Sequence, residues 1–234
     1  MKRYLGLAIL ISAIGLNSLS SFAAPAYGTH MPKKGHWHWG WQTNVVLRRN
    51  LEREWGKLRS YQTFITGSFG LTPWLCFDGK LGWGNIKNRP ENISRIDYPG
   101  NFAGGYGFRV KLYRHATDKI KSVFGFQHIS VHPDHQYVGK EKRKVILDDW
   151  QFSFLVSYDL SRYFVPYAGV KLSRMDLIEK AGDIRKRKRS ENSELAGMIL
   201  GVDIYLDKTH RQWFNLECRF FDEAAVSLGV VFSF

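Results

Sequence analysis

The chain has 234 residues, of which 34 are Lys or Arg and 21 are Asp or Glu, so its formal net charge is +13. Hydrophobic residues make up 44% and aromatic residues 15% of the chain, which excludes an intrinsically disordered protein. The long apolar run at residues 4–16 lies at the N-terminus, and the rest of the sequence excludes a bundle of transmembrane helices. These values leave a single folded domain that is rich in aromatic residues and glycine.

The N-terminus has the three parts of a secretory signal peptide. Lys2 and Arg3 form a basic start, residues 4–16 form an apolar core, and residues 21–23 (Ser-Phe-Ala) form a small-x-small cleavage site. A membrane anchor is the alternative, but it needs about 20 apolar residues. We therefore expect an exported bacterial protein with a signal peptide at residues 1–23, an N-terminal linker at 24–35 and the folded domain at 36–234.

The two cysteines, Cys76 and Cys218, lie far apart in the sequence. Two cysteines cannot form the disulfide framework of a small exported scaffold. We expect them to be separate apolar side chains on strands.

The strongest pattern in the chain is an alternation of apolar and polar residues with a period of two, which places every second side chain on one face of a β-strand. Trp37, Trp39 and Trp41 alternate in this way with His38 and Gly40. The pattern recurs along the chain and predicts an all-β protein of about ten strands, with eight or twelve as alternatives. The predicted strands are residues 37–48, 58–70, 74–85, 102–114, 119–131, 146–159, 163–175, 194–206, 212–221 and 225–234.

The lengths and connections of these strands indicate how they are arranged. Most have about 10 residues or slightly more, the length that a tilted strand needs to cross a bilayer. Longer polar connections follow the odd-numbered strands, at residues 84–101, 132–144 and 176–193, and tight turns follow the even-numbered ones. This rhythm is typical of a transmembrane antiparallel up-and-down β-barrel, whose closed sheet satisfies every backbone amide in lipid.

Several charged residues on the polar strand faces are expected to lie inside this barrel. A barrel of about ten strands is narrow, and long side chains of both signs would largely fill it. We interpret these charges as a structural network rather than a solute pathway, so we expect a filled polar interior and no open diffusion pore. The set is Asp78, Lys80, Arg109, Lys111, Asp159, Lys171, Asp203, Glu217 and Arg219.

A His-x-Ser sequence on the fifth predicted strand is the candidate catalytic site. His128 and Ser130 are two residues apart, so they share a strand face and can form the base and nucleophile pair of acyl transfer. Phe124 and Phe126 share that face, which predicts that it faces lipid.

The segment at residues 126–130 (Phe-Gln-His-Ile-Ser) resembles the His-x-Ser motif of PagL-type lipid A deacylases, outer-membrane barrels whose His and Ser act from the lipid-facing surface. The resemblance implies that Ser130 is the nucleophile and His128 the base in cleavage of a fatty acyl ester of lipid A. The chain departs from that family because Val131 replaces the usual Asn, the motif lies far from the C-terminus, and the orienting Glu has no certain counterpart.

The longer pattern His128-x-Ser130-x-His132-x-Asp134 is also similar to an uncharacterised family of outer-membrane proteins, a resemblance that implies no activity. A third catalytic member is suggested by the predicted hairpin. If the fifth and sixth strands fold near Val138, Ser130 lies opposite Asp148, which is then within a diagonal step of His128. Asp148 is the candidate orienting residue, and Glu141 in the connecting loop is its rival.

Two other interpretations of this region stay open. His128, Ser130 and His132 can simply mark the polar rim of the membrane, with His132 and Asp134 as binding residues in the loop. A metal site built from His128, His132, Asp134 and His135 is disfavoured, because histidines four residues apart on one strand face are too far apart to chelate easily. We expect no metal and no cofactor.

A cationic block lies between the seventh and eighth predicted strands, at Arg185, Lys186, Arg187, Lys188 and Arg189. In an external loop its nearest anionic partners are outer-membrane lipids and the phosphates of lipopolysaccharide, whereas nucleic acid is not an expected partner. A solvated loop without a ligand is the alternative.

The chain ends on a strand, and residues 227–234 read Ser-Leu-Gly-Val-Val-Phe-Ser-Phe. This ending resembles the C-terminal recognition signal of bacterial outer-membrane proteins, in which glycine and aromatic residues stand at fixed distances from the terminus. The resemblance implies an outer-membrane location and recognition by the barrel assembly machinery through Gly229, Phe232 and Phe234.

Two functions are consistent with these patterns. The first is non-catalytic, an envelope barrel with a structural or surface-binding role; the alternative is a lipid A acyl-ester hydrolase that uses Ser130 and His128. Omptin proteases are also ten-stranded barrels, and Asp148, Asp149 and His135 supply their residue types, but no spacing here matches, so that comparison is analogy alone.

Overall fold

The computed structural model describes residues 27–91, 94–114, 119–181 and 188–234. Its elements are β1 (Trp37–Asn50), the 3-10 helix η1 (Arg53–Trp55), β2 (Lys57–Gly70), β3 (Leu75–Arg89), β4 (Ile96–Arg114), β5 (Ile120–Val131), β6 (Gln136–Val138), β7 (Glu141–Tyr158), β8 (Phe164–Ala181), β9 (Lys188–Glu191), β10 (Ala196–Tyr205), β11 (Gln212–Phe220) and β12 (Glu223–Ser233).

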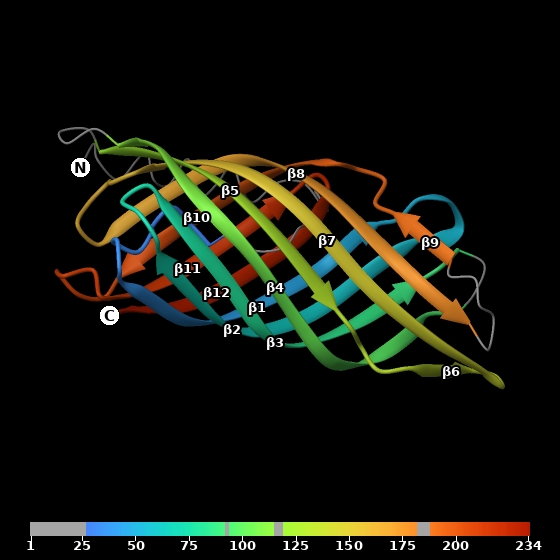
Figure 1. Ribbon diagram of the computed structural model, residues 1–234. Helices are drawn as coiled ribbons and strands as arrows, with labels where there is room; N and C mark the ends of the chain where they lie inside the picture. The colour runs from blue at the N-terminus through green and yellow to red at the C-terminus, as the bar shows by residue number, and fades with distance from the viewer. Residues whose placement is uncertain (1–26, 92–93, 115–118, 182–187) are drawn as a thin grey trace, which may run out of the picture.

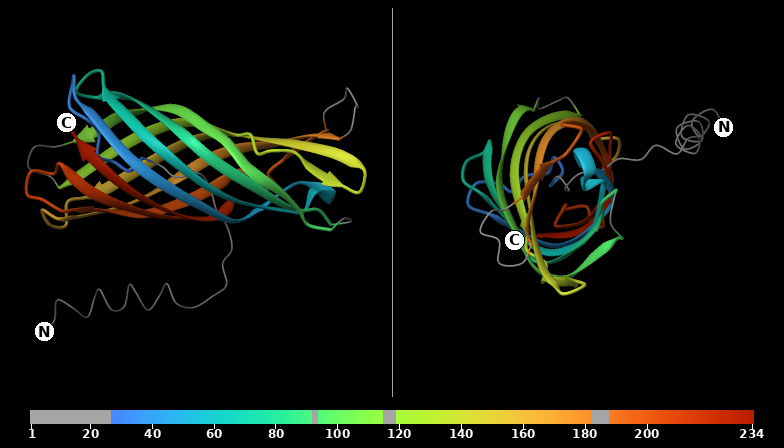
Figure 2. Two further views of the ribbon diagram at one scale, coloured as in Figure 1. Left: turned by 90° about the horizontal axis from the view of Figure 1, so that it is seen from below. Right: turned by 90° about the vertical axis from the view of Figure 1, so that its right-hand side faces the viewer.

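The strands form one closed antiparallel barrel (Figures 1 and 2). Ten long strands follow one another around it in chain order, β7 pairs directly with β5 and β8, and β1 pairs with β12 to close the ring. The short strands β6 and β9 pair only with the far ends of β7 and β8. The predicted all-β barrel of ten strands is confirmed.

The two ends of the barrel differ. The beginning of β1 and the end of β12 lie at one end together with the short turns at residues 71–74, 159–163 and 206–211, and β6 and β9 lie at the other (Figure 1). Because short turns are periplasmic in outer-membrane barrels, we name these the periplasmic end and the outer end. Among the described residues, none belongs to a helix long and apolar enough to cross a membrane.

Three connections predicted as polar loops are largely strand. β3 extends to Arg89, β4 begins at Ile96, and β7 and β8 continue to pair as far as Arg143 and Ala181. The reason is that the backbone ladder continues after the apolar outer stripe has ended, so the hydrophobic alternation stops before the strand does. The predicted turn at residues 115–118 lies outside the described residues.

The barrel wall is apolar on its outer surface. The exposed side chains of its central zone are large and hydrophobic, as at Leu81, which is 62% exposed, and at Tyr106, Phe152 and Val170. Seven of the nine predicted inward charges are buried inside: Asp78, Lys80, Arg109, Lys171, Asp203, Glu217 and Arg219. The other two, Lys111 and Asp159, lie at the periplasmic rim, where Asp159 pairs with Lys121 at 2.6 Å.

Buried ion pairs cross-link the middle of the lumen. Arg49 of β1 lies 2.6 Å from Asp149 of β7 and 3.4 Å from Glu223 at the start of β12. Lys171 lies 2.8 Å from Asp222. Arg49 was not among the predicted inward residues, because a bulge between Val46 and Arg48 shifts the pairing and reverses the faces of the strand beyond it.

The outer half of the lumen is apolar rather than polar. Leu58, Ile86, Leu147 and Leu177 belong to a buried cluster there, against which Trp55 of η1 packs. The expected polar interior is therefore confined to the middle and periplasmic parts. Cys76 faces the lumen, Cys218 is half-buried on the outer face, and both are free thiols.

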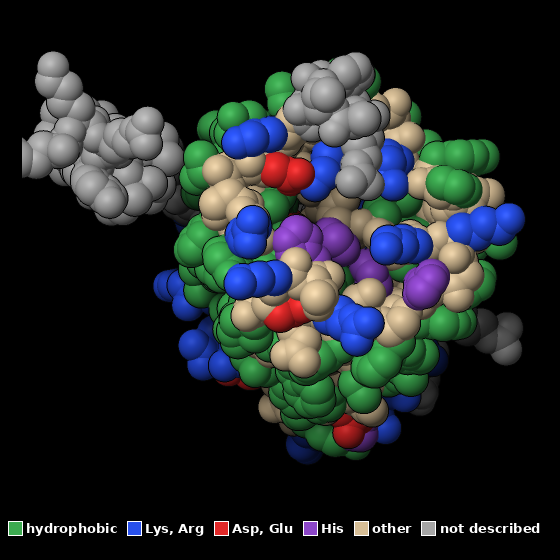
Figure 3. Space-filling model, turned by 90° about the vertical axis from the view of Figure 1, so that its left-hand side faces the viewer, with side chains coloured by type: hydrophobic (Ala, Val, Ile, Leu, Met, Phe, Trp, Pro, Cys, Tyr) green, Lys and Arg blue, Asp and Glu red, His purple; other side chains and the backbone are tan. Residues whose placement is uncertain are grey.

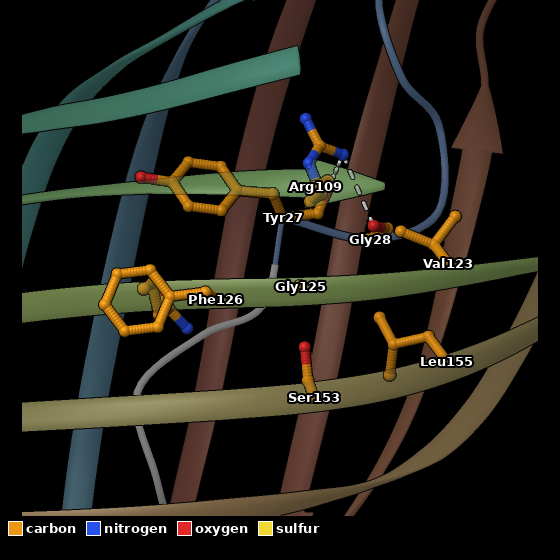
Figure 4. Close-up of a pocket in the computed structure, with 9 residues that line it drawn as sticks. Tyr27, Gly28, Arg109, Val123, Gly125, Phe126, Ser153 and Leu155 are labelled. Atoms are coloured by element: carbon orange, nitrogen blue, oxygen red, sulfur yellow. Dashed lines mark hydrogen bonds between the residues drawn. The ribbon is translucent and has the colours of Figure 1, made fainter. Parts of the chain in front are cut away.

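The start of the described chain lies inside the barrel. Arg109 Nη1 donates hydrogen bonds to the carbonyl oxygens of Tyr27 and Gly28 at 3.1 and 3.3 Å (Figure 4). It also donates to the carbonyl oxygen of His30 at 2.7 Å, and Arg109 is itself held by Asp78. On the opposite wall, His30 Nδ1 lies 2.6 Å from the hydroxyl of Tyr205. The segment at residues 27–32, predicted as part of the linker at 24–35, thus crosses the lumen near its periplasmic end.

Little space remains beside this segment. The cavity lined by Tyr27, Arg109 and Ser153 holds about 10 Å³, and so does one beside Arg49 and Glu223. Each volume is comparable to that needed for one water molecule. Figure 3 shows the periplasmic mouth occupied by histidine side chains with Lys and Arg around them.

Candidate active site

The His-x-Ser sequence lies on the outer surface of the barrel, near the outer end of β5. Gln127, Ile129 and Val131 are buried inside the lumen, so the alternate residues Phe126, His128 and Ser130 face outward. The register with β7 is the predicted one, since Ser130 pairs with Asp148 and His128 with Trp150.

Ser130 has two polar neighbours within hydrogen-bond distance. Its Oγ lies 2.5 Å from Oδ1 of Asp148 and 2.8 Å from Nε2 of His132. The hydroxyl carries a single proton, so it can donate to only one of the two acceptors at a time. His132 is a side chain that can take this proton as a base, whereas the sequence analysis had named it as a rim or loop binding residue and not as a catalytic one.

His128 is held by aromatic rings rather than by Ser130. Its ring stacks on Trp150 with centroids 4.1 Å apart, and the ring of Tyr106 lies 5.3 Å away on the other side. Its Nε2 lies 3.5 Å from Oδ1 of Asp148 but makes no hydrogen bond within the described residues. Asp148 therefore lies between Ser130 and His128, and the structure brings all three sequence-predicted residues together.

The other residues named for this region have separate partners. Glu141, the rival of Asp148, binds Arg143 at 2.9 Å on the β6–β7 hairpin. Asp134 accepts hydrogen bonds from the backbone N–H and the ring of His135, and these lower its pKa. No set of three His, Cys, Asp or Glu side chains within the described ranges is placed to bind a metal ion.

The site lies at the boundary between the apolar band and the polar outer end. On its periplasmic side, the outer faces of β5 and β7 carry Phe126 and Phe152, whose ring centroids are 5.2 Å apart. On its other side, Asp148 pairs across the sheet with Asp176 of β8, which binds the guanidinium of Arg189. A serine hydroxyl at this height would meet the part of a lipid where acyl chains join the headgroup.

Only part of the cationic block can be placed. Arg185, Lys186 and Arg187 lie outside the described residues, whereas Lys188 and Arg189 belong to β9. Arg189 donates from Nε to Oδ1 of Asp176 at 2.7 Å.

The proposed recognition residues Gly229 and Phe232 lie on β12, and Phe234 follows it. The N–H of Phe234 donates to the carbonyl of Trp37 at 3.0 Å, which helps to close the barrel between its two terminal strands.

The chain matches no protein-family model and no curated protein. Solved structures resemble it in fold. An outer membrane channel from Pseudomonas putida F1 has a TM-score of 0.48 and 7% identity, over 91% of this chain and 100% of that chain. The outer membrane protease OmpT from Escherichia coli has a TM-score of 0.44 and 11% identity, over 89% and 100%. The translocator domain of the autotransporter NalP from Neisseria meningitidis has a TM-score of 0.42 and 9% identity, over 98% and 95%.

The closed sheet, its apolar outer surface and its buried polar network define an integral outer-membrane β-barrel protein. A closed antiparallel sheet with an apolar outer band is the architecture of barrels that span the bacterial outer membrane, and on that ground we assign the protein to that membrane.

Proposed function

We propose that this barrel is an acyl-ester hydrolase that acts on lipid A or a related phosphorylated acyl lipid of the outer leaflet. The observation that carries the proposal is the position of Ser130 on the lipid-facing surface, with its hydroxyl in contact with both His132 and Asp148. A histidine and a carboxylate around a serine are the groups that nucleophilic acyl transfer uses.

In this reaction Ser130 Oγ attacks the ester carbonyl while Nε2 of His132 takes the hydroxyl proton. The ester C–O bond breaks, the departing alkoxide takes the proton back from His132, and the acyl group stays on Ser130. Water then attacks the acyl-enzyme with His132 again as base, which releases a fatty acid and restores the serine. The Asp148 carboxylate contacts the same Oγ and so places a negative charge near the imidazole as it takes up the proton.

The surface around Ser130 suits an acyl chain. Phe126, Phe152 and Trp150 form a continuous aromatic surface on its periplasmic side. On β4, Gly104 stands opposite Ser130, and a Cβ there would lie 3.1 Å from the ring of Phe102. The glycine thereby lets Phe102 cover the sheet beside the serine, so apolar contacts are available next to the reacting ester.

The test is mass spectrometry of lipid A incubated with the refolded protein in detergent. Wild-type protein should release one fatty acid from lipid A, and Ser130→Ala should release none. Ser161→Ala is the matched control, because Ser161 lies in a periplasmic turn and should leave turnover unchanged. Unchanged lipid A with folded wild-type protein would refute the hydrolase and leave the non-catalytic surface-binding role.

A further inference from the structure

A groove adjoins the candidate site on the side nearer the outer end of the barrel. It has a volume of about 340 Å³ and is lined by parts of four elements: the start of β4, the segment at residues 132–135, and the far ends of β7 and β8. His132 lines it and also contacts Ser130 at 2.8 Å, so the groove and the nucleophile share one side chain.

The groove has fixed walls. The N–H of His132 donates to the carbonyl of Phe102, and the N–H of Asp134 donates to that of Pro99, each at 2.8 Å. These bonds hold the segment at residues 132–135 against β4. A binding site that is already formed loses less conformational entropy when its ligand arrives.

Two lysines make the groove cationic. Lys144 and Lys180 line it and stand directly opposite each other on β7 and β8. Like charges in directly opposed positions of a sheet repel each other, and within the described residues neither ammonium has an ion-pair partner. The acid that lines the groove, Asp134, accepts hydrogen bonds from His135 and is also in electrostatic reach of Lys144, but it is one carboxylate against two lysines.

On the opposite face of the same strands, a cationic side chain is neutralised by carboxylates of the protein itself. Arg143, next to Lys144, binds Glu141 at 2.9 Å and Glu179 at 3.3 Å. On the groove face two lysines stand against one lining carboxylate, Asp134, so the groove keeps an excess of positive charge.

We propose that this groove binds a phosphate group of the lipid whose ester reaches Ser130. The proposal deepens the hydrolase function and rests on it for the identity of the lipid. A phosphate between Lys144 and Lys180 would relieve their repulsion, and His132 would keep the headgroup beside the nucleophile. The acyl chain then extends toward Phe126 and Phe152, in the direction of the membrane.

The test measures binding without turnover. Folded Ser130→Ala protein in detergent is mixed with equal amounts of lipid A carrying its phosphates and lipid A from which they have been removed, and native mass spectrometry gives the ratio of the two complexes. We expect the phosphorylated lipid to be preferred about tenfold, the effect of roughly 1.4 kcal/mol. Adding Lys144→Ala and Lys180→Ala should reduce that preference to about onefold.

Lys142→Ala in the same background is the matched control, because Lys142 lies on the same strand face but does not line the groove. It should keep the preference. A preference that survives loss of both groove lysines, or is absent before their removal, would refute the proposal. So would displacement of the lipid by an equal concentration of inorganic phosphate, which would make the groove a site for the free ion.

The two proposals can fail separately. If the preference is observed but wild-type protein leaves lipid A intact, the hydrolase is refuted and the headgroup site stands. If lipid A is cleaved but the preference is unaffected by the lysines, only the headgroup site is refuted.

Discussion

Ser130 Oγ lies 2.8 Å from Nε2 of His132, whereas His128 stacks on Trp150 and its Nε2 lies 3.5 Å from Asp148. The two histidines are placed symmetrically in the sequence, two residues before and two residues after the serine. Their neighbours make them different: Tyr106 and Trp150 hold His128 between their rings, whereas among the described residues only the ring of Phe102, at 6.0 Å, lies near that of His132.

We expect His132→Gln to lower the rate of ester hydrolysis by about 10²-fold to 10⁴-fold, the usual contribution of a general base. His128→Gln should lower the rate less, because this substitution removes a neighbour of Asp148 and not the group that takes the proton. The measurement is the initial rate at which each variant hydrolyses an acyl ester in detergent. His36→Gln, which alters an exposed histidine at the periplasmic end, is the control. A larger loss in His128→Gln than in His132→Gln would reverse this assignment.

The hold of Arg109 on the N-terminal segment can be tested by chemical labelling. Thr29 is buried in the lumen, so Thr29→Cys, in a Cys76→Ser, Cys218→Ser background, should be protected from a water-soluble thiol reagent. Arg109→Met removes the donor to three carbonyls and should make this cysteine reactive.

Arg109→Met should also destabilise the barrel by about 3–5 kcal/mol, because it leaves Asp78 buried without its cation. Asp78→Asn combined with Arg109→Met should restore part of that stability while Thr29→Cys stays reactive. Equal labelling with and without Arg109 would show that the arginine does not hold the segment.

Arg49 should be one of the most important polar residues for stability. It connects β1 with Asp149 of β7 and with Glu223 of β12, and it is almost fully buried. Arg49→Ala should lower the free energy of unfolding by about 3–5 kcal/mol, measured by urea titration in detergent with tryptophan fluorescence. Arg95→Ala removes an exposed pair with Asp97 and should cost less than about 1 kcal/mol. Equal effects would contradict the buried network.

Because the outer surface faces lipid, the destabilisation caused by an arginine there should depend on its depth in the membrane. Leu81 lies on the outer face of β3 between Phe77 and Trp83, near the middle of the apolar band. Leu81→Arg should destabilise the protein in lipid bilayers by about 2–4 kcal/mol, and Leu160→Arg, in a periplasmic turn, by about 0–1 kcal/mol. The comparison requires reversible unfolding from vesicles. A cost that is the same at both positions would place Leu81 outside the hydrocarbon layer.

Much of the fold could be predicted because the alternation is regular. The alternating Trp37, Trp39 and Trp41 assigned β1, and the same parity placed Asp78 and Arg109 inside. Counting residues from the hairpin near Val138 also gave the pairing of Ser130 with Asp148. A bulge defeats this counting, as at Arg49, because one extra residue exchanges the two faces of a strand.

The sequence by itself determined the barrel, the face on which His128 and Ser130 lie, and their cross-strand neighbour, since all three follow from a period of two and one hairpin register. Only the tertiary structure decided that His132 contacts Ser130, that Lys144 and Lys180 form one side of a groove, and that residues 27–32 enter the lumen. These contacts join strands and segments far apart in the chain, and their geometry depends on how the closed sheet and its loops place side chains. Local alternation contains no information about that placement.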